Sequence, residues 1–169
     1  MDIGTISIVM TAVSVSVGVA YYILNIRSTL RNMQTALETR QAQFFMQIYN
    51  RFNETEFFSK FTDILTWKWK DYDDFIEKYG WKTNPKAWYS LGSVGAFFEG
   101  IGVLVHRKLI DVNLVSELLS RHIVIFWEKI EPISKEMRKR LQLPVDVRLE
   151  YLYNEVKPII ERQRMELKT

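Results

Sequence analysis

The chain contains no cysteine among its 169 residues and only two histidines, His106 and His122. The missing thiols exclude disulfide bonds, thiolate metal sites and a cysteine nucleophile. The two histidines lack the H-E-x-x-H spacing of zinc peptidases, and no G-x-S-x-G motif is present. We therefore expect no enzymatic activity, no catalytic residue, no metal and no cofactor.

Glycine and proline are also scarce, with seven and four residues. Gly92, Gly95, Gly100 and Gly102 fall in one segment, but they form neither G-x-G-x-x-G nor a Walker loop with its lysine. Small residues inside a helix more often let a neighbouring helix approach closely, and we expect that role here. The sequence offers no phosphate-binding loop.

Charge is absent from Ile3 through Ile26. The alternating valines of this run resemble a half-buried strand. In lipid, however, a lone strand leaves its backbone groups unpaired, whereas a helix of about 20 apolar residues pairs them internally and crosses the bilayer. We predict a transmembrane anchor over residues 1–26 that contacts membrane lipid through residues 3–26.

The residues behind this run indicate the orientation of the anchor. Arg27 and Arg31 follow it directly, and Tyr21 and Tyr22 stand at the depth of an aromatic belt, so all four are candidate lipid-facing residues. We expect a single-pass protein of the cytoplasmic membrane, with its N-terminus outside and its C-terminal domain in the cytoplasm. A cleaved signal peptide ending at residues 18–20 is the alternative, disfavoured because no basic residue precedes the apolar run.

Small residues line one side of the anchor. Ser7, Thr11, Ser14 and Gly18 are spaced by four, three and four positions, which would let two such helices pack at backbone distance. The alternative is that the hydroxyl groups bond carbonyls of their own helix.

A second helix is predicted over residues 27–52, without glycine or proline. Its apolar positions form one stripe, composed of Ile26, Leu30, Met33, Leu37, Phe44, Ile48 and Phe52. The stripe suits packing on the protein's own domain or a parallel coiled coil between two copies. Arg40 and Gln47 fall on the seam and weaken the coiled coil.

The remaining chain, residues 53–161, predicts a bundle in an all-α protein of about five to six helices, followed by a charged tail over 162–169. Asn53 with Glu56, Asn84 with Pro85, and Asp111 each resemble a helix start. Pro144 and Asp146 open the last helix. Pro132 and Pro158 are expected to bend, restart or limit their helices.

Residues 87–105 are apolar enough to raise the alternative of a second span, which Glu99 near their middle disfavours. A soluble helix is preferred. If the helices on either side of residues 107–111 form a hairpin, Glu99 lies within a turn of Arg121 and His122. We therefore predict a buried polar pair in which Arg121 holds the Glu99 carboxylate.

Trp67 and Trp69 alternate with Lys68 and Lys70, a pattern that can stack nucleic-acid bases. Three aspartates follow within the next four residues, so we expect no nucleic-acid binding. We place the tryptophans at the edge of the helical core, with a contact to the membrane surface as the alternative. The basic residues of "SKEMRKRL" fit either a solvated face or a lipid-facing patch.

Three blocks of the chain, "FFEGIGVLVHRKLID", "FWEKIEP" and "RLEYLYNE", resemble a family of small membrane-anchored helical proteins of bacteria and archaea classed as a domain of unknown function. The similarity covers the whole chain. It implies the fold and one N-terminal span, and it assigns no reaction and no catalytic residue.

These observations favour a membrane-anchored interaction module, such as an adaptor, a regulator or a subunit of a membrane complex, acting through a protein partner or self-association. The alternative is a lipid- or small-ligand-binding module with a groove lined by the phenylalanine-rich helix after residue 53 and the tryptophans. An apolar pocket with a few convergent polar groups would favour this alternative.

Overall fold

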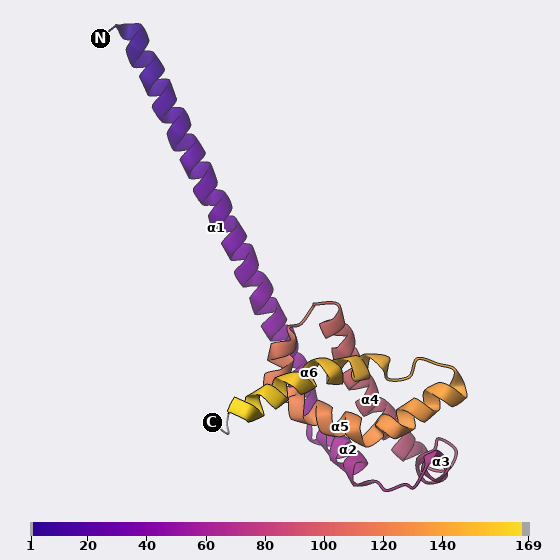
Figure 1. Ribbon diagram of the computed structural model, residues 1–169. Helices are drawn as coiled ribbons and strands as arrows, with labels where there is room; N and C mark the ends of the chain where they lie inside the picture. Colours follow the sequence, from indigo (N-terminus) through magenta and orange to yellow (C-terminus); the bar gives the residue numbers. More distant parts are fainter. Residues whose placement is uncertain (1, 167–169) are drawn as a thin grey trace. The chain divides into compact units, whose positions relative to one another are not determined.

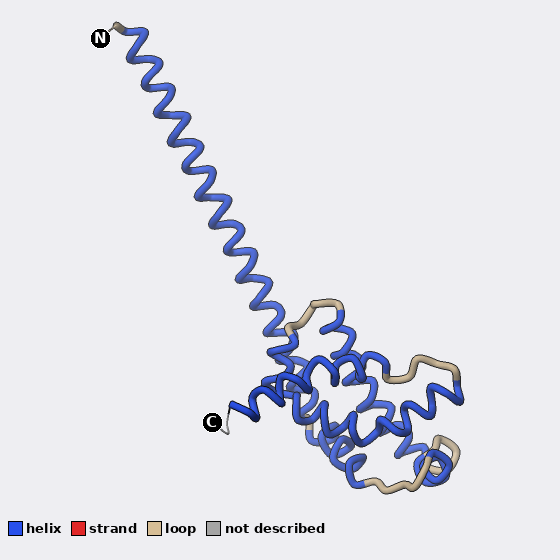
Figure 2. The backbone as a smooth tube through the Cα atoms, in the orientation of Figure 1, coloured by secondary structure: helices blue, strands red, loops and turns tan. Residues whose placement is uncertain are grey.

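The computed structural model describes residues 2–166, which form six helices and no strand (Figures 1 and 2). The helices are α1 (Ile3–Asn53), α2 (Thr55–Thr66), α3 (Tyr72–Tyr79), α4 (Pro85–His106), α5 (Val112–Leu141) and α6 (Val147–Glu166). The predicted all-α fold is confirmed. The chain divides into two compact units, with the boundary between Gln43 and Phe44.

The first unit is the larger part of α1, which runs without interruption through the predicted junction at Arg27. Its valines are helical despite their alternation, because a helix pairs every backbone group within the segment. Large apolar side chains from Ile3 to Leu24 are exposed. By length and composition, α1 and α4 are the described helices that could cross a membrane.

The second unit begins at Phe44, earlier than the expected boundary at residue 53. The reason is that Phe45 and Phe52, on the last turns of α1, are completely or almost completely buried. The Phe52 ring centroid lies 5.4 Å from that of Phe61 and 5.9 Å from that of Phe98. The end of α1 is therefore part of the bundle core.

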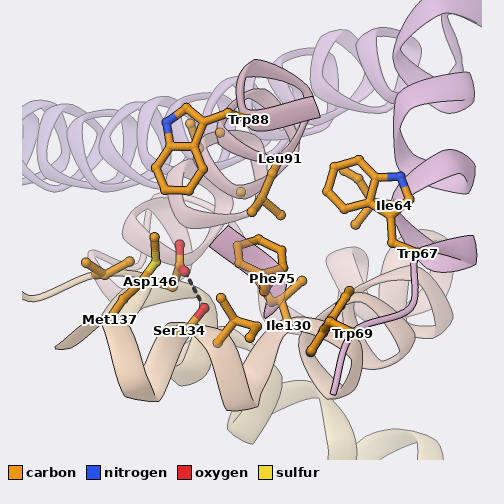
Figure 3. Close-up of a pocket in the computed structure, with 15 residues that line it drawn as sticks. Ile64, Trp67, Trp69, Phe75, Trp88, Leu91, Ile130, Ser134, Met137 and Asp146 are labelled. Atoms are coloured by element: carbon orange, nitrogen blue, oxygen red, sulfur yellow. Dashed lines mark hydrogen bonds between the residues drawn. The ribbon is translucent and has the colours of Figure 1, made fainter. Parts of the chain in front are cut away.

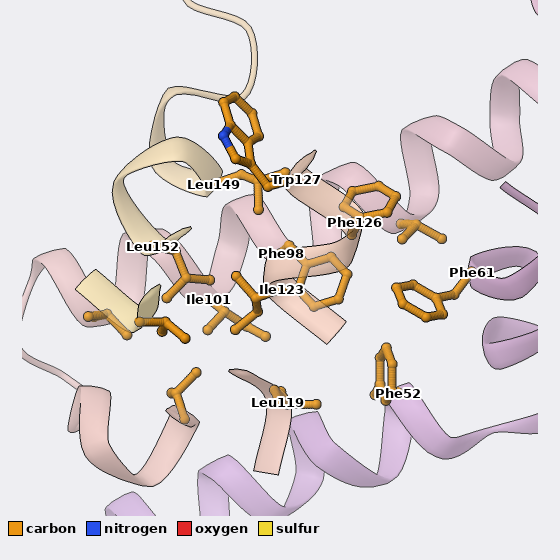
Figure 4. Close-up of a cluster of buried hydrophobic side chains, with 14 of the residues drawn as sticks. Phe52, Phe61, Phe98, Ile101, Leu119, Ile123, Phe126, Trp127, Leu149 and Leu152 are labelled. Atoms are coloured by element: carbon orange, nitrogen blue, oxygen red, sulfur yellow. The ribbon is translucent and has the colours of Figure 1, made fainter. Parts of the chain in front are cut away.

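The core of the bundle is built from phenylalanine and branched aliphatic side chains (Figure 4). α6 packs closely against both α4 and α5, and α2 packs against α4. The backbones of α4 and α5 come close at few positions. Large rings such as Phe98 and Phe126, whose centroids are 5.2 Å apart, fill the space between these two helices.

Two of the predicted helix starts are confirmed by their caps. The Asn84 side chain accepts a hydrogen bond from the Ala87 N–H, and Asp111 accepts one from the Asn113 N–H. The predicted cap at Asn53 is wrong. The Asn53 side chain instead donates to the Tyr49 carbonyl, and α2 begins at Thr55 without a side-chain cap.

Neither internal proline ends its helix. α5 continues through Pro132 and α6 through Pro158, and both rings are exposed. Buried residues on both sides of Pro132, including Ile130 and Ile133, hold α5 against the bundle and offset the lost hydrogen bond. α6 also extends into the expected tail as far as Glu166; residues 167–169 of that tail lie outside the described residues.

Candidate functional site

A half-open apolar pocket of about 170 Å³ lies within the bundle (Figure 3). A close-packed protein interior has few voids larger than a water molecule, so a pocket of this size needs an explanation. Residues from four helices and two loops line it: Ile64, Trp67, Trp69, Phe75, Trp88, Leu91, Gly92, Gly95, Ala96, Ile130, Ile133, Ser134, Met137, Val145 and Asp146.

Aromatic contacts hold the tryptophans of the pocket wall in place. The Trp67 ring stacks on Tyr79 at 4.3 Å between centroids, and Trp69 meets the edge of Phe75 at 5.3 Å. The ammonium of Lys129 lies 4.5 Å from the Trp69 ring centroid and also donates to the Trp67 carbonyl. The two tryptophans are thus packed at the edge of the core, as the sequence predicted.

Two polar side chains meet at one end of the pocket. The hydroxyl of Ser134, a buried residue of α5, donates to Asp146 Oδ2 at 2.6 Å. Asp146 precedes α6 and has a left-handed backbone, with φ of 52°. Because Val145 and Asp146 turn the chain back into the bundle, this carboxyl faces α4 and α5 instead of solvent.

The carboxyl of Asp146 is electrostatically unfavourable in its charged form. Burial raises the pKa of Asp146 above its usual value, and the Glu99 carboxylate raises it further. The Ser134 hydrogen bond and the charge of Arg138 act in the opposite direction. Arg138 binds Glu150 and the Val145 carbonyl through two of its nitrogens, and Asp146 forms no ion pair within residues 2–166.

Two glycines of α4 keep the pocket open. A Cβ atom at Gly92 would meet nothing within 4 Å, and one at Gly95 would lie 3.6 Å from Asp146 Oδ1. Both glycines line the pocket, so a larger residue at either position would add atoms to its wall. The expected close helix approach occurs further along the same helix, at Gly102, where a Cβ would lie 2.1 Å from the Arg148 carbonyl oxygen.

The predicted pair between Glu99 and Arg121 is wrong. The Glu99 carboxylate accepts hydrogen bonds from the backbone N–H groups of Arg148 and Leu149, at 3.1 and 2.7 Å. Glu99 therefore caps the start of α6 from outside that helix, where the partial positive charge of the helix dipole favours an anion. Arg121 is exposed and makes no ion pair with Glu99.

The physical reason for this error is the path of the last helix. The pairing assumed that α4 and α5 form a closely packed antiparallel hairpin. Instead, α6 packs against both α4 and α5. It occupies the position at which these two helices were expected to contact each other. The N-terminal backbone of α6 then supplies the hydrogen-bond donors that Glu99 needs.

His122, the third predicted member of that cluster, lies in an aromatic environment. Its ring centroid is 4.8 Å from that of Phe52 and 5.5 Å from that of Phe61. Burial lowers the pKa of His122, and the neighbouring charge of Arg121 lowers it further. Its Nδ1 atom is buried and has no hydrogen-bond partner among the described residues. The side chain acts as a neutral aromatic ring in the core.

The basic residues of "SKEMRKRL" are largely neutralised within the protein. Lys135 pairs with Glu131, Arg140 with Asp73 and Glu136, and Arg138 with Glu150. The segment is therefore an ion-paired surface of the bundle, which leaves little free positive charge for anionic lipid. Within residues 2–166, no group of three metal-ligating side chains is assembled.

Two hydroxyl groups on the small face of α1 bond to their own helix. Thr11 Oγ1 donates to the Ser7 carbonyl and Ser14 Oγ to the Met10 carbonyl, both at 2.9 Å. These two bonds are those of the self-bonded alternative. A Cβ atom at Gly18 would meet nothing within 4 Å among the described residues. Tyr21, Tyr22, Arg27 and Arg31 are exposed on the same helix.

The pocket itself was only partly anticipated by the sequence. Trp67 and Trp69 line it, as the ligand-binding alternative expected. The phenylalanine-rich α2 contributes only Ile64 to the described pocket, because Phe57 and Phe61 are packed in the main hydrophobic core. Trp88, Ser134 and Asp146 were not identified as site residues. The available signal was Asp146 itself, an acid two residues after Pro144, and this pattern is equally typical of a helix start.

The fold and pocket define a helical bundle domain that follows a long apolar N-terminal helix. The chain belongs to the family described as "Domain of unknown function (DUF4760)", whose model matches residues 10–168. Neither a curated protein nor a solved structure matches this chain.

Proposed function

We propose that this protein is a membrane-anchored binding module whose cytoplasmic bundle takes a small apolar ligand into the pocket between the tryptophans and Asp146. The observation that carries the proposal is the pocket: apolar walls with two convergent polar groups, Ser134 and Asp146. Ligand sites in proteins are concave, mainly apolar, and carry a few polar groups that orient the ligand.

The size of the pocket supports a ligand of limited dimensions. An engineered apolar cavity of about 150 Å³ in another protein holds a benzene ring. The present pocket, at about 170 Å³, therefore suits a single ring or a short branched chain. The aromatic walls supply large contact areas with few rotatable bonds, which limits the entropy lost on binding.

The membrane anchor is supported by residues 3–26, a helical segment without charge whose apolar side chains are exposed. Arg27 and Arg31 follow it and favour a cytoplasmic position for the bundle. An anchored bundle would sample ligands that concentrate at the membrane surface.

A second candidate function, protein interaction through α1, rests on a different observation. Leu30, Met33 and Leu37 form one apolar stripe and are each about 60% exposed. This surface fits an adaptor or a subunit of a membrane complex, and it does not compete with the pocket.

The ligand proposal is tested by the melting temperature of the full chain in lipid nanodiscs with 2-phenylethanol as the probe. A ligand that binds only the folded protein raises its melting temperature. Gly92→Leu fills the pocket from a position with open space, and Gly100→Leu is its matched control, since Gly100 also has open space but lies outside the pocket.

We expect 2-phenylethanol to raise the melting temperature of the native protein and of Gly100→Leu, and to leave Gly92→Leu unchanged. Equal responses of all three proteins would mean that the probe acts through the lipid, and would contradict the proposal.

A further inference from the structure

The pocket has an acidic end and an aromatic interior, and this combination restricts the chemistry of its ligand. Figure 3 shows the Ser134–Asp146 hydrogen bond on one side of the pocket, with Trp67, Trp69 and Phe75 toward the other. The following inference rests on the proposed function and names the ligand class.

One oxygen of Asp146 is available to a ligand. Oδ2 accepts the Ser134 hydroxyl, whereas Oδ1 faces Gly95 and accepts no hydrogen bond from the described residues. An alanine at position 95 would bring its Cβ to 3.6 Å from Oδ1, so the glycine leaves a ligand room beside that oxygen.

The charges around Asp146 favour a cation. Glu99 on α4 adds negative charge. The positive charge of Arg138 on α5 acts in the opposite direction, but its guanidinium is paired with the Glu150 carboxylate and also binds the Val145 carbonyl. Arg138 does not line the pocket. A half-buried carboxylate with no ion-pair partner in the described part of the chain gains most from a ligand that brings a positive charge and N–H donors.

The rest of the pocket is suited to the apolar part of such a ligand. Trp67, Trp69, Trp88 and Phe75 present aromatic surfaces, which attract cations as well as apolar groups. The protein already places one cation in this way, because the Lys129 ammonium lies over the Trp69 ring from outside the pocket. An anionic ligand would be repelled by both Asp146 and Glu99.

We propose that the pocket binds a small organic amine, with its ammonium group on Asp146 Oδ1 and its apolar body, of about the size of one ring, against Trp67, Trp88 and Phe75. Ser134 positions the carboxylate and does not contact the amine. No covalent step is involved.

The test compares 2-phenylethylamine with 2-phenylethanol, which share the ring and chain and differ in the charged group. Isothermal titration calorimetry uses the full chain in phosphatidylcholine nanodiscs near neutral pH, with empty nanodiscs as the blank. We expect the amine to bind at least about tenfold more tightly than the alcohol. This factor corresponds to about 1.4 kcal/mol.

Asp146→Asn is the matched variant, because asparagine tolerates the left-handed backbone and retains an acceptor for Ser134. It should abolish the preference for the amine and leave the affinity for the alcohol within about twofold. Ser134→Ala, which keeps the charge, should retain most of the preference.

A second measurement uses the native protein and needs no substitution. Acidification protonates Asp146; the charge of Glu99 favours this protonation and the charge of Arg138 opposes it. Because the protonated carboxyl group has lost its charge, the affinity for the amine should fall, while the affinity for the alcohol stays constant. Equal affinities for the two probes, or a preference that survives Asp146→Asn, would overturn the amine assignment and leave the proposed function standing. Absence of binding by both probes would overturn both.

Discussion

Gly102 of α4 lies directly against the main-chain carbonyl of Arg148 on α6, so that a Cβ atom at Gly102 would be 2.1 Å from that oxygen. One turn earlier on α4, Glu99 accepts hydrogen bonds from the first N–H groups of α6. One turn before that, Gly95 faces Asp146. These three positions share one face of α4, and together they fix the start of α6 and the acidic end of the pocket.

The close approach at Gly102 predicts a large effect of a single methyl group. Gly102→Ala should lower the free energy of unfolding by about 1–3 kcal/mol, because the backbone of α6 must move away. Gly100→Ala is the control: its Cβ meets nothing within 4 Å, and alanine should stabilise the helix by up to about 1 kcal/mol. Urea denaturation in mild detergent measures both, and similar effects of the two substitutions would refute the close contact.

Because Glu99 caps α6, its contribution to stability should not depend on Arg121. Glu99→Ala should lower the free energy of unfolding by about 1–3 kcal/mol, since it leaves two N–H groups of α6 without their acceptor. Arg121→Met, at an exposed position, should change it by less than about 0.5 kcal/mol. The double variant should show additive effects. A coupling above about 1 kcal/mol would mean that the two side chains interact after all.

His122 predicts a specific dependence of stability on pH. Burial and Arg121 lower its pKa in the folded state, so the unfolded chain binds more protons as the pH falls. The contribution of His122 to stability is therefore complete above pH 6.5 and is lost progressively below it. In His122→Phe this loss should be absent, which the urea midpoints at pH 7.5 and 5.5 would show. An equal loss in the native protein and the variant would contradict the assignment.

The orientation proposed for the N-terminal helix can be tested by single cysteines, because the natural chain has none. A membrane-impermeant maleimide should label Asp2→Cys in intact cells, whereas Lys82→Cys, at an exposed position of the bundle, should react only after the cells are opened. Labelling of Lys82→Cys in intact cells would place the bundle outside and revive the two-span or cleaved-signal alternatives.

Local sequence signals were sufficient for most of the helix positions. Asn84 and Asp111 were identified as caps because a cap is formed by residues two or three positions apart. Asn53 has the same signature, but α1 continues as far as Asn53 itself because Phe52 is buried in the core. The tendency of Pro132 to interrupt a helix was likewise overridden by tertiary packing, which the preferences of single residues do not include.

The candidate site was less predictable, because it depends on contacts between distant segments. Glu99 was identified as a buried acid, yet its partners lie 49 and 50 residues further along the chain. The pocket exists where side chains leave space unfilled, and Gly92 and Gly95 contribute to it because they have no side chain. The periodicity of apolar residues in a sequence does not predict such a void.

The central claim, that the bundle binds a small apolar ligand in this pocket, is tested most directly by the indole N–H resonances of the full chain labelled with ¹⁵N-tryptophan in nanodiscs. Trp67, Trp69 and Trp88 line the pocket, whereas Trp81 and Trp127 lie outside it and serve as internal references. Addition of 2-phenylethanol should shift the first three resonances in the native protein and in Gly100→Leu, and none of them in Gly92→Leu. Uniform shifts of all five resonances, or unchanged resonances of the pocket tryptophans, would contradict the account.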